Sequence, residues 1–170
     1  ACLKNQAVYQ QRYKNENATN QFSDVTINNW RTLFFSCPTA SKNMYVPHGS
    51  NMMRYLYQNE KDAAKKQAYL DTLMMIYDRR IQYFGEESNY IGKKGTELYL
   101  LNPMQYETAY EYCRKSVDAM GNNAEAKTLY VCLQTAVLKF QKGTMEKGAV
   151  IELYQKISDV FTVTIDKADK

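Results

Sequence analysis

The apolar side chains of the stretch LDTLMMIYDRRIQYFG, residues 70–85, recur at the spacing of a helix. They stand at Leu70, Leu73, Met74, Tyr77, Ile81 and Phe84, with steps of 3, 1, 3, 4 and 3 residues. This spacing puts them on one face of an α-helix. Gly85 follows where a helix would stop, because glycine adopts positive φ without strain. The stretch therefore predicts a helix that buries one face and ends before Gly85.

Three charged residues, Asp78-Arg79-Arg80, stand in the middle of this stretch. Asp78 and Arg79 fall opposite the apolar face, where exposed charges contribute little to stability. Arg80 falls close to that face, so its stem should lie along the apolar surface and its guanidinium should reach an acidic group or a carbonyl. We predict that Asp78 and Arg79 are largely exposed and that Arg80 is partly buried.

The same apolar pattern occurs in three further places, and the four copies begin 47, 36 and 44 residues apart. The further copies are Ser23, Thr26, Ile27, Trp30, Phe34 and Cys37; Tyr106, Ala109, Tyr110, Cys113, Val117 and Met120; and Val150, Leu153, Tyr154, Ile157, Phe161 and Thr164. Further helical segments are predicted between the copies, at about 4–16, 43–59, 90–101 and 124–141. Asn102 is expected to act as an N-cap before Pro103, because asparagine is a favoured capping residue.

This alternation predicts an all-α fold of helical hairpins at a period typical of helical-repeat proteins. Single hairpins of this kind leave an apolar face uncovered, so neighbouring hairpins must stack. We expect a right-handed α-α superhelix of about four stacked antiparallel hairpins, at about 1–40, 41–85, 89–121 and 123–165, in one repeat domain over residues 1–170. The charged end at residues 165–170 is expected to form a tail without a capping helix, as in a piece of a longer array.

The composition favours a globular helical domain and argues against several other classes. The chain has 170 residues, a net charge of +4, 15 tyrosines and only 7 glycines and 3 prolines. Its basic residues are spread along the chain, so nucleic-acid binding is the less favoured alternative. No apolar run approaches the roughly 20 residues that span a bilayer, and no signal-peptide core is present at the start.

No cluster of residues identifies a reaction. Glu86 and Glu87 are adjacent acids in a turn, and no second acidic cluster opposes them. Pro47-His48-Gly49-Ser50 contains the single histidine, and a loop in which Ser50 caps the next helix explains it better than a Ser/His catalytic pair. Phosphate-loop, dinucleotide and zinc-protease motifs are absent, and one histidine cannot complete a Cys/His zinc site. We expect no enzyme activity, no cofactor and no metal.

Two copies of the apolar pattern resemble the second helix of a tetratricopeptide repeat. That helix has small residues and an aromatic residue at fixed places and a proline at its end, as in residues 22–38 and, with Gly121 as the stop, 106–121. This chain differs in its uneven spacing and in Leu73, Arg80 and Leu153, which occupy places usually filled by small residues. Residues 35–43 and 76–85 also resemble divergent tetratricopeptide proteins that Gram-negative gut bacteria export to the cell envelope. The resemblance covers most of the chain.

The resemblance implies a non-catalytic scaffold that binds a protein or peptide in the periplasm or at the outer membrane. In that family the first helix of each hairpin lines a concave binding surface. The resemblance therefore implies contact with a partner at Tyr9, Arg12, Tyr13, Arg54, Tyr57, Tyr90, Lys94, Glu97 and Gln134. The alternative function is a basic repeat module that binds nucleic acid or another polyanion.

The four cysteines form two pairs that are symmetric about predicted turns. Cys2 and Cys37 lie about equally far from the turn at residues 17–20, so we favour a disulfide between them. Such a bond would indicate an oxidising compartment. Cys113 and Cys132 are symmetric about residues 122–123, but Cys113 lies on the apolar face. Two buried free thiols are therefore favoured over a second disulfide.

Overall fold

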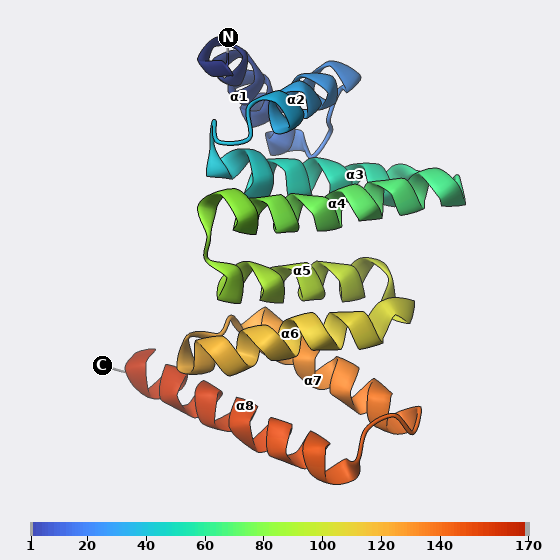
Figure 1. The fold of residues 1–170 in the computed structure, drawn as a ribbon, viewed down its shortest axis with the longest axis vertical. Coiled ribbons are helices and arrows are strands. Elements are labelled where there is room, and N and C mark those ends of the chain that lie inside the picture. Colours follow the sequence, from blue (N-terminus) through green and yellow to red (C-terminus); the bar gives the residue numbers. More distant parts are fainter. Residues whose placement is uncertain (1, 169–170) are drawn as a thin grey trace. The chain divides into compact units, whose positions relative to one another are not determined.

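The structure is a computed structural model that describes the backbone of residues 2–168 and the side chains of residues 2 and 6–163. Every regular element in this range is helical and none is a strand, so the predicted all-α class is confirmed. The contacts divide the chain after Gly85 into two compact units, unit 1 (Ala1–Gly85) and unit 2 (Glu86–Lys170). Figure 1 shows the helices of each unit.

Unit 1 contains α1 (Cys2–Thr19), α2 (Asp24–Ser36), α3 (Ser50–Asn59) and α4 (Ala63–Phe84). α1 packs against α2 and α3 packs against α4. Two short helical turns, η1 (Lys42–Met44) and η2 (Tyr45–Gly49), connect α2 to α3. The core is rich in aromatic residues, because Trp30, Phe34 and Tyr45 are fully buried.

The turn between α1 and α2 is held by the carboxylate of Glu16. The Ser23 backbone N–H and hydroxyl donate to it over 2.9 and 2.7 Å, and the Thr26 hydroxyl donates over 2.8 Å. The Ser23 hydroxyl oxygen also accepts from the Thr26 N–H, which caps the start of α2. The end of one helix therefore supplies the capping network of the next.

The segment predicted as one helix over 43–59 is interrupted at Val46–Pro47. Val46, which lies within the turn η2, has extended backbone angles, and α3 begins only at Ser50. Proline restricts the residue before it to extended angles, so an uninterrupted helix was the wrong prediction. Ser50 is not an N-cap, since it is itself helical and donates its hydroxyl to the Pro47 carbonyl over 3.0 Å.

α4 begins after Asp62, whose carboxylate accepts from the Lys65 N–H over 2.9 Å, and it ends at Gly85 with φ +72°. Asp78 is exposed, as predicted. Arg80 is more deeply buried than predicted, at 1% exposed, and it donates to the Gly85 carbonyl over 3.2 Å. The prediction for Arg79 was wrong, because its guanidinium lies 4.4 Å from the centre of the Phe34 ring and the residue is half-buried.

Unit 2 contains α5 (Glu87–Leu101), α6 (Tyr106–Met120), α7 (Ala126–Gln141) and α8 (Lys147–Ala168), with short turns η3 (Pro103–Gln105) and η4 (Gly121–Asn123). α5 packs against α6 and α7, and α7 packs against α6 and α8. Pro103 begins a helical turn as predicted, but Asn102 makes no side-chain capping bond. The Asn102 carbonyl instead accepts from the Gln105 N–H over 3.0 Å.

The prediction for the last copy of the apolar pattern was partly wrong. Leu153 and Ile157 are buried, but Tyr154 and Phe161 are 58% and 38% exposed, and Val160 is buried instead. Leu153, Ile157 and Val160 follow the spacing of one helix face. Val160 stands at the place where the earlier copies bury Leu33, Arg80 and Ser116. The backbone is helical as far as Ala168, which includes most of the predicted tail. The Thr164 side chain lies outside the described residues.

Two glycines of α5 make its close packing possible. A Cβ atom at Gly92 would lie 2.4 Å from Ser116 Oγ, and one at Gly95 would lie 2.8 Å from the Ala109 carbonyl oxygen. Sequence reasoning did not predict this role, because an isolated glycine in a helical pattern has several explanations.

We expect Gly95→Ala to lower the free energy of unfolding by about 1–3 kcal/mol, because the added methyl group meets backbone that cannot move freely. Gly148→Ala is the matched control, since its Cβ would meet nothing within 4 Å. The control should be neutral or raise stability by up to about 1 kcal/mol through helix propensity. Urea unfolding measures both, and an equally stable Gly95→Ala variant would contradict the close packing of α5 on α6.

Cys2 and Cys37 are joined by a disulfide with a Cα–Cα distance of 5.9 Å, which ties the start of α1 to the end of α2. Cys113 and Cys132 are buried free thiols in the core of unit 2, as favoured. Burial raises the pKa of each of these two thiols to about 12, so neither forms a reactive thiolate near neutral pH.

Alkylation in denaturant without reductant should therefore modify two cysteines, and prior reduction should raise this to four. Reduction should also lower the free energy of unfolding by about 4 kcal/mol, because a long loop is released in the unfolded chain. Mass spectrometry and urea unfolding provide the measurements. Four modified cysteines without reductant would contradict the Cys2–Cys37 bond.

Candidate functional site

A row of aromatic rings crosses unit 1 and connects its first hairpin to the second. His48 stacks on Tyr13 at 3.8 Å between ring centres, and Tyr13 stacks on Phe22 at 5.6 Å. Phe22 then meets the Tyr55 ring edge-on at 5.5 Å. We call these four residues the aromatic row. A surface hollow opens at each end of this row.

The first hollow, here the His48 hollow, lies at the end of the row where α1 meets the turns before α3. Its volume is about 400 Å³, and its lining residues are Gln10, Tyr13, Lys14, Asn17, Asn43 and His48. Two rings form the apolar part of its wall. Three carboxamides and one ammonium group supply the polar part, so the hollow offers both donors and acceptors.

Hydrogen bonds fix the Tyr13 wall of the His48 hollow. The Tyr13 hydroxyl donates to Asn17 Oδ1 over 2.9 Å and accepts from Asn51 Nδ2 over 2.9 Å. Asn51 Oδ1 in turn accepts from Arg54 over 3.1 Å. The predicted site residue Arg54 therefore acts on the hollow indirectly, by orienting the amide that holds Tyr13.

Burial keeps the His48 imidazole and the hydroxyl groups of Tyr9 and Tyr13 uncharged at neutral pH. His48 Nδ1 is buried and has no hydrogen-bond partner among the described residues. The buried hydroxyl of Tyr9 also has no partner among them. The centres of the Tyr9 and His48 rings lie 5.7 Å apart. Burial lowers the pKa of His48 to about 4, so the imidazole is neutral at pH 7. Burial also raises the pKa of Tyr9 and Tyr13, which keeps both hydroxyl groups protonated.

The second hollow, here the Tyr55 hollow, lies at the other end of the row, where the start of α2, the end of α3 and α4 meet. Its volume is about 210 Å³, and it is lined by aromatic, acidic and apolar side chains that include Phe22, Asp24, Tyr55, Leu56, Glu60 and Tyr69. A more open hollow of about 380 Å³ beside it shares Phe22 and Tyr55 and contains Glu16.

The structure places the predicted contact residues of unit 1 unevenly. Tyr13 lines the His48 hollow, whereas Tyr9 is 1% exposed and belongs to the core. Arg12 is exposed, while Arg54 and Tyr57 are half-buried. Lys66 Nζ lies 4.7 Å from the centre of the Tyr57 ring. Sequence reasoning missed His48, because a lone histidine in a loop is more often structural.

The predicted contact residues of unit 2 do not gather around any hollow. Lys94 and Glu97 are each 8% exposed, so neither side chain is accessible to a partner in this structure. Lys94 is covered by the α6 residue Tyr112, whose ring centre lies 4.6 Å from Nζ. Tyr90 and Gln134 are half-buried. Whether these four residues contact a partner stays a prediction.

The described residues form neither a metal site nor a membrane-spanning helix. No group of three or more His, Cys, Asp or Glu side chains there is placed to hold a metal ion. Over the same part of the chain, no helix combines the length and the apolar character needed to cross a membrane. The candidate functional site is therefore argued from the hollows of unit 1.

Comparison with protein-family models, with curated proteins and with solved structures found no match to this chain.

The low pKa of His48 predicts a pH-dependent stability. The folded-state value of about 4 lies below the usual value of 6.5, so the unfolded chain binds more protons between these pH values. The free energy of unfolding should therefore fall as pH decreases from about 6.5 to about 4. Urea unfolding across this window should show a smaller decrease for His48→Gln than for the native protein, and equal pH dependence would contradict the burial of the imidazole.

Proposed function

We propose that this protein is a non-catalytic helical-repeat scaffold that binds a segment of a protein or peptide partner in the His48 hollow. The observation that carries the proposal is the chemistry of this hollow, in which two fixed rings stand beside flexible amide side chains. Binding sites commonly combine an apolar wall with a few polar groups that orient the ligand. The predicted contact residue Tyr13 belongs to this wall.

The polar side chains of the His48 hollow suit the main chain of a peptide. A carboxamide offers a donor and an acceptor, as a peptide group does, so Gln10 and Asn43 complement an extended segment. Among the hydrogen bonds of the described residues, the side chains of these two amides take part in none, and Asn43 is exposed. Both are therefore able to exchange water for a ligand without breaking an internal bond.

The resemblance to exported tetratricopeptide proteins supports a location in the cell envelope, and the Cys2–Cys37 disulfide is compatible with an oxidising compartment. Within that proposal, the superhelical stacking of the hairpins is the expected architecture of the scaffold. Export is thus part of the proposed function, as is the repeat character of the fold.

The test is selection of binding peptides from a random displayed library, followed by measurement of Kd by fluorescence anisotropy. The double variant Gln10→Ala, Asn43→Ala should weaken binding of the selected peptide by roughly fivefold to a hundredfold, since two hydrogen bonds are lost. Asn28→Ala, Gln155→Ala is the matched control, because Asn28 and Gln155 are exposed elsewhere. This control should leave Kd unchanged.

Failure to enrich any peptide, or equal affinity of the hollow variant, would overturn the proposal. The alternative, a basic module for nucleic acid, is tested in parallel with a labelled single-stranded oligonucleotide. Binding that falls steeply between 50 and 200 mM salt, as expected of contacts to several phosphates, would support that alternative and count against the peptide site.

A further inference from the structure

We propose that the Tyr55 hollow is a second binding site, which takes an arginine or lysine side chain of a partner peptide. This site is separate from the His48 hollow and does not rest on the function proposed above. The two hollows lie at opposite ends of the aromatic row, and they differ in charge. The inference follows from the shape, the rings and the carboxylates of the Tyr55 hollow.

The rings of the Tyr55 hollow come from three different segments. Phe22 precedes α2, Tyr55 belongs to α3, and Tyr69 belongs to α4. Phe22 is 6% exposed and holds Tyr55 in an edge-on contact, so this part of the wall is preformed. Faces of aromatic rings attract cations, by about 0.5–1 kcal/mol at exposed sites.

Two carboxylates flank these rings. Asp24 stands in the first turn of α2 and lines the hollow. Glu60 follows the last residue of α3, and its Oε1 accepts from the Lys61 and Asp62 N–H groups over 2.8 and 2.9 Å. These backbone N–H groups hold the pKa of Glu60 below its usual value. Glu60 is therefore ionised at neutral pH.

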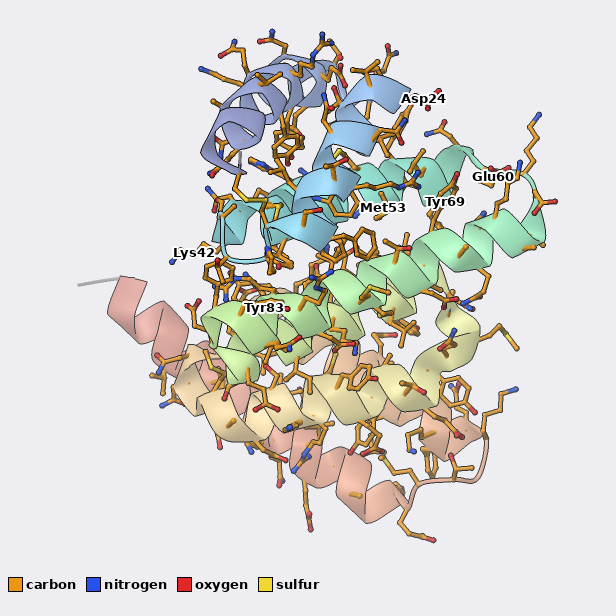
Figure 2. The ribbon with its side chains drawn as sticks, turned by 45° about the horizontal axis from the view of Figure 1, so that its top comes forward. Asp24, Lys42, Met53, Glu60, Tyr69 and Tyr83 are labelled. Atoms are coloured by element: carbon orange, nitrogen blue, oxygen red, sulfur yellow. A yellow bond between two sulfur atoms is a disulfide. The ribbon has the colours of Figure 1, made fainter. Side chains whose placement is uncertain are left out.

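The direction of α3 adds to this negative charge. The carboxyl end of a helix carries a partial negative charge, and α3 ends at Asn59 beside the hollow. Figure 2 shows Asp24, Glu60 and Tyr69 together at one end of unit 1, with Lys42 labelled at the other end. A protein with a net charge of +4 thus presents a local acidic and aromatic surface, which selects a cationic partner.

The neighbouring hollow around Glu16 is a poorer cation site. The Glu16 carboxylate already accepts three hydrogen bonds from Ser23 and Thr26, and these bonds hold the turn between α1 and α2. A cation there would compete with structural contacts. Glu60 accepts two hydrogen bonds, both through Oε1 and both from the adjacent Lys61 and Asp62 N–H groups, whereas Glu16 accepts three through both of its oxygens. The cationic group is therefore assigned to the Tyr55 hollow.

Lys65 is an exposed cation close in sequence to Glu60. The backbone N–H groups of Asp62 and Lys61 lower the pKa of Glu60, and the charge of Lys65 lowers it further. Removing this charge should strengthen binding of a basic peptide. Lys65→Gln therefore supplies a variant with the opposite expected sign.

The experiment uses the full chain, isotope-labelled for NMR, and the peptide acetyl-Gly-Gly-Arg-Gly-Gly-amide. A citrulline peptide, which has the same shape without the charge, is the control ligand. We expect saturable shifts at the amides of Asp24, Tyr55 and Tyr69 with the arginine peptide only. Asp24→Asn and Glu60→Gln should each weaken binding about two- to fivefold, and Lys65→Gln should tighten it by a similar factor.

The protein controls are Glu146→Gln and Glu152→Gln, which neutralise exposed acids of unit 2 and should leave affinity unchanged. The folds of all variants are compared by their NMR spectra, and Glu60→Gln retains the oxygen that accepts from Lys61 and Asp62. Equal shifts with the citrulline peptide, shifts confined to other residues, or no saturable shift would each overturn the inference. Retained peptide binding at the His48 hollow in that event would leave the proposed function untouched.

Discussion

The packing of Trp30 against the turn before α3 is the contact on which unit 1 depends. The Trp30 indole N–H donates to the Met44 carbonyl over 2.8 Å, and the indole is fully buried. Gly49 leaves room for it, since a Cβ atom there would lie 2.7 Å from the indole ring and 2.9 Å from the Met44 oxygen. This fit anchors the turn that carries His48. The stacking of His48 on Tyr13, and with it the aromatic row, follows from that anchor.

The two ends of the aromatic row have different chemistry although they share one support. The His48 hollow contains amides, a lysine and a neutral imidazole, which suit the main chain of a peptide. The Tyr55 hollow combines rings with the side chains of Asp24 and Glu60, which suits a cationic side chain. One row of rings therefore supports two hollows of different chemistry, which we propose as two recognition surfaces.

Sequence reasoning succeeded where the signal is local. The apolar spacing from Leu70 to Phe84 predicted α4, and the helix ends at Gly85 because that residue adopts positive φ. Sequence reasoning failed where the exposure of a residue depends on side chains of another helix. Arg79 was placed on the exposed side, but the Phe34 ring of another helix covers it. In α8, Val160 is buried whereas Phe161 is 38% exposed, and a helical pattern alone cannot tell which of two adjacent residues faces the core.

Helix periodicity and turn residues act over a few positions, so the sequence alone indicated most of the helices and favoured the pairing of Cys2 with Cys37. Which rings meet, how deeply Arg80 is buried and where hollows open became visible in the tertiary structure. His48 and Tyr13 are far apart in sequence, as Asp24 is from Glu60 and Tyr69. Such groups converge only after helices pack, because packing brings together side chains that no local pattern relates.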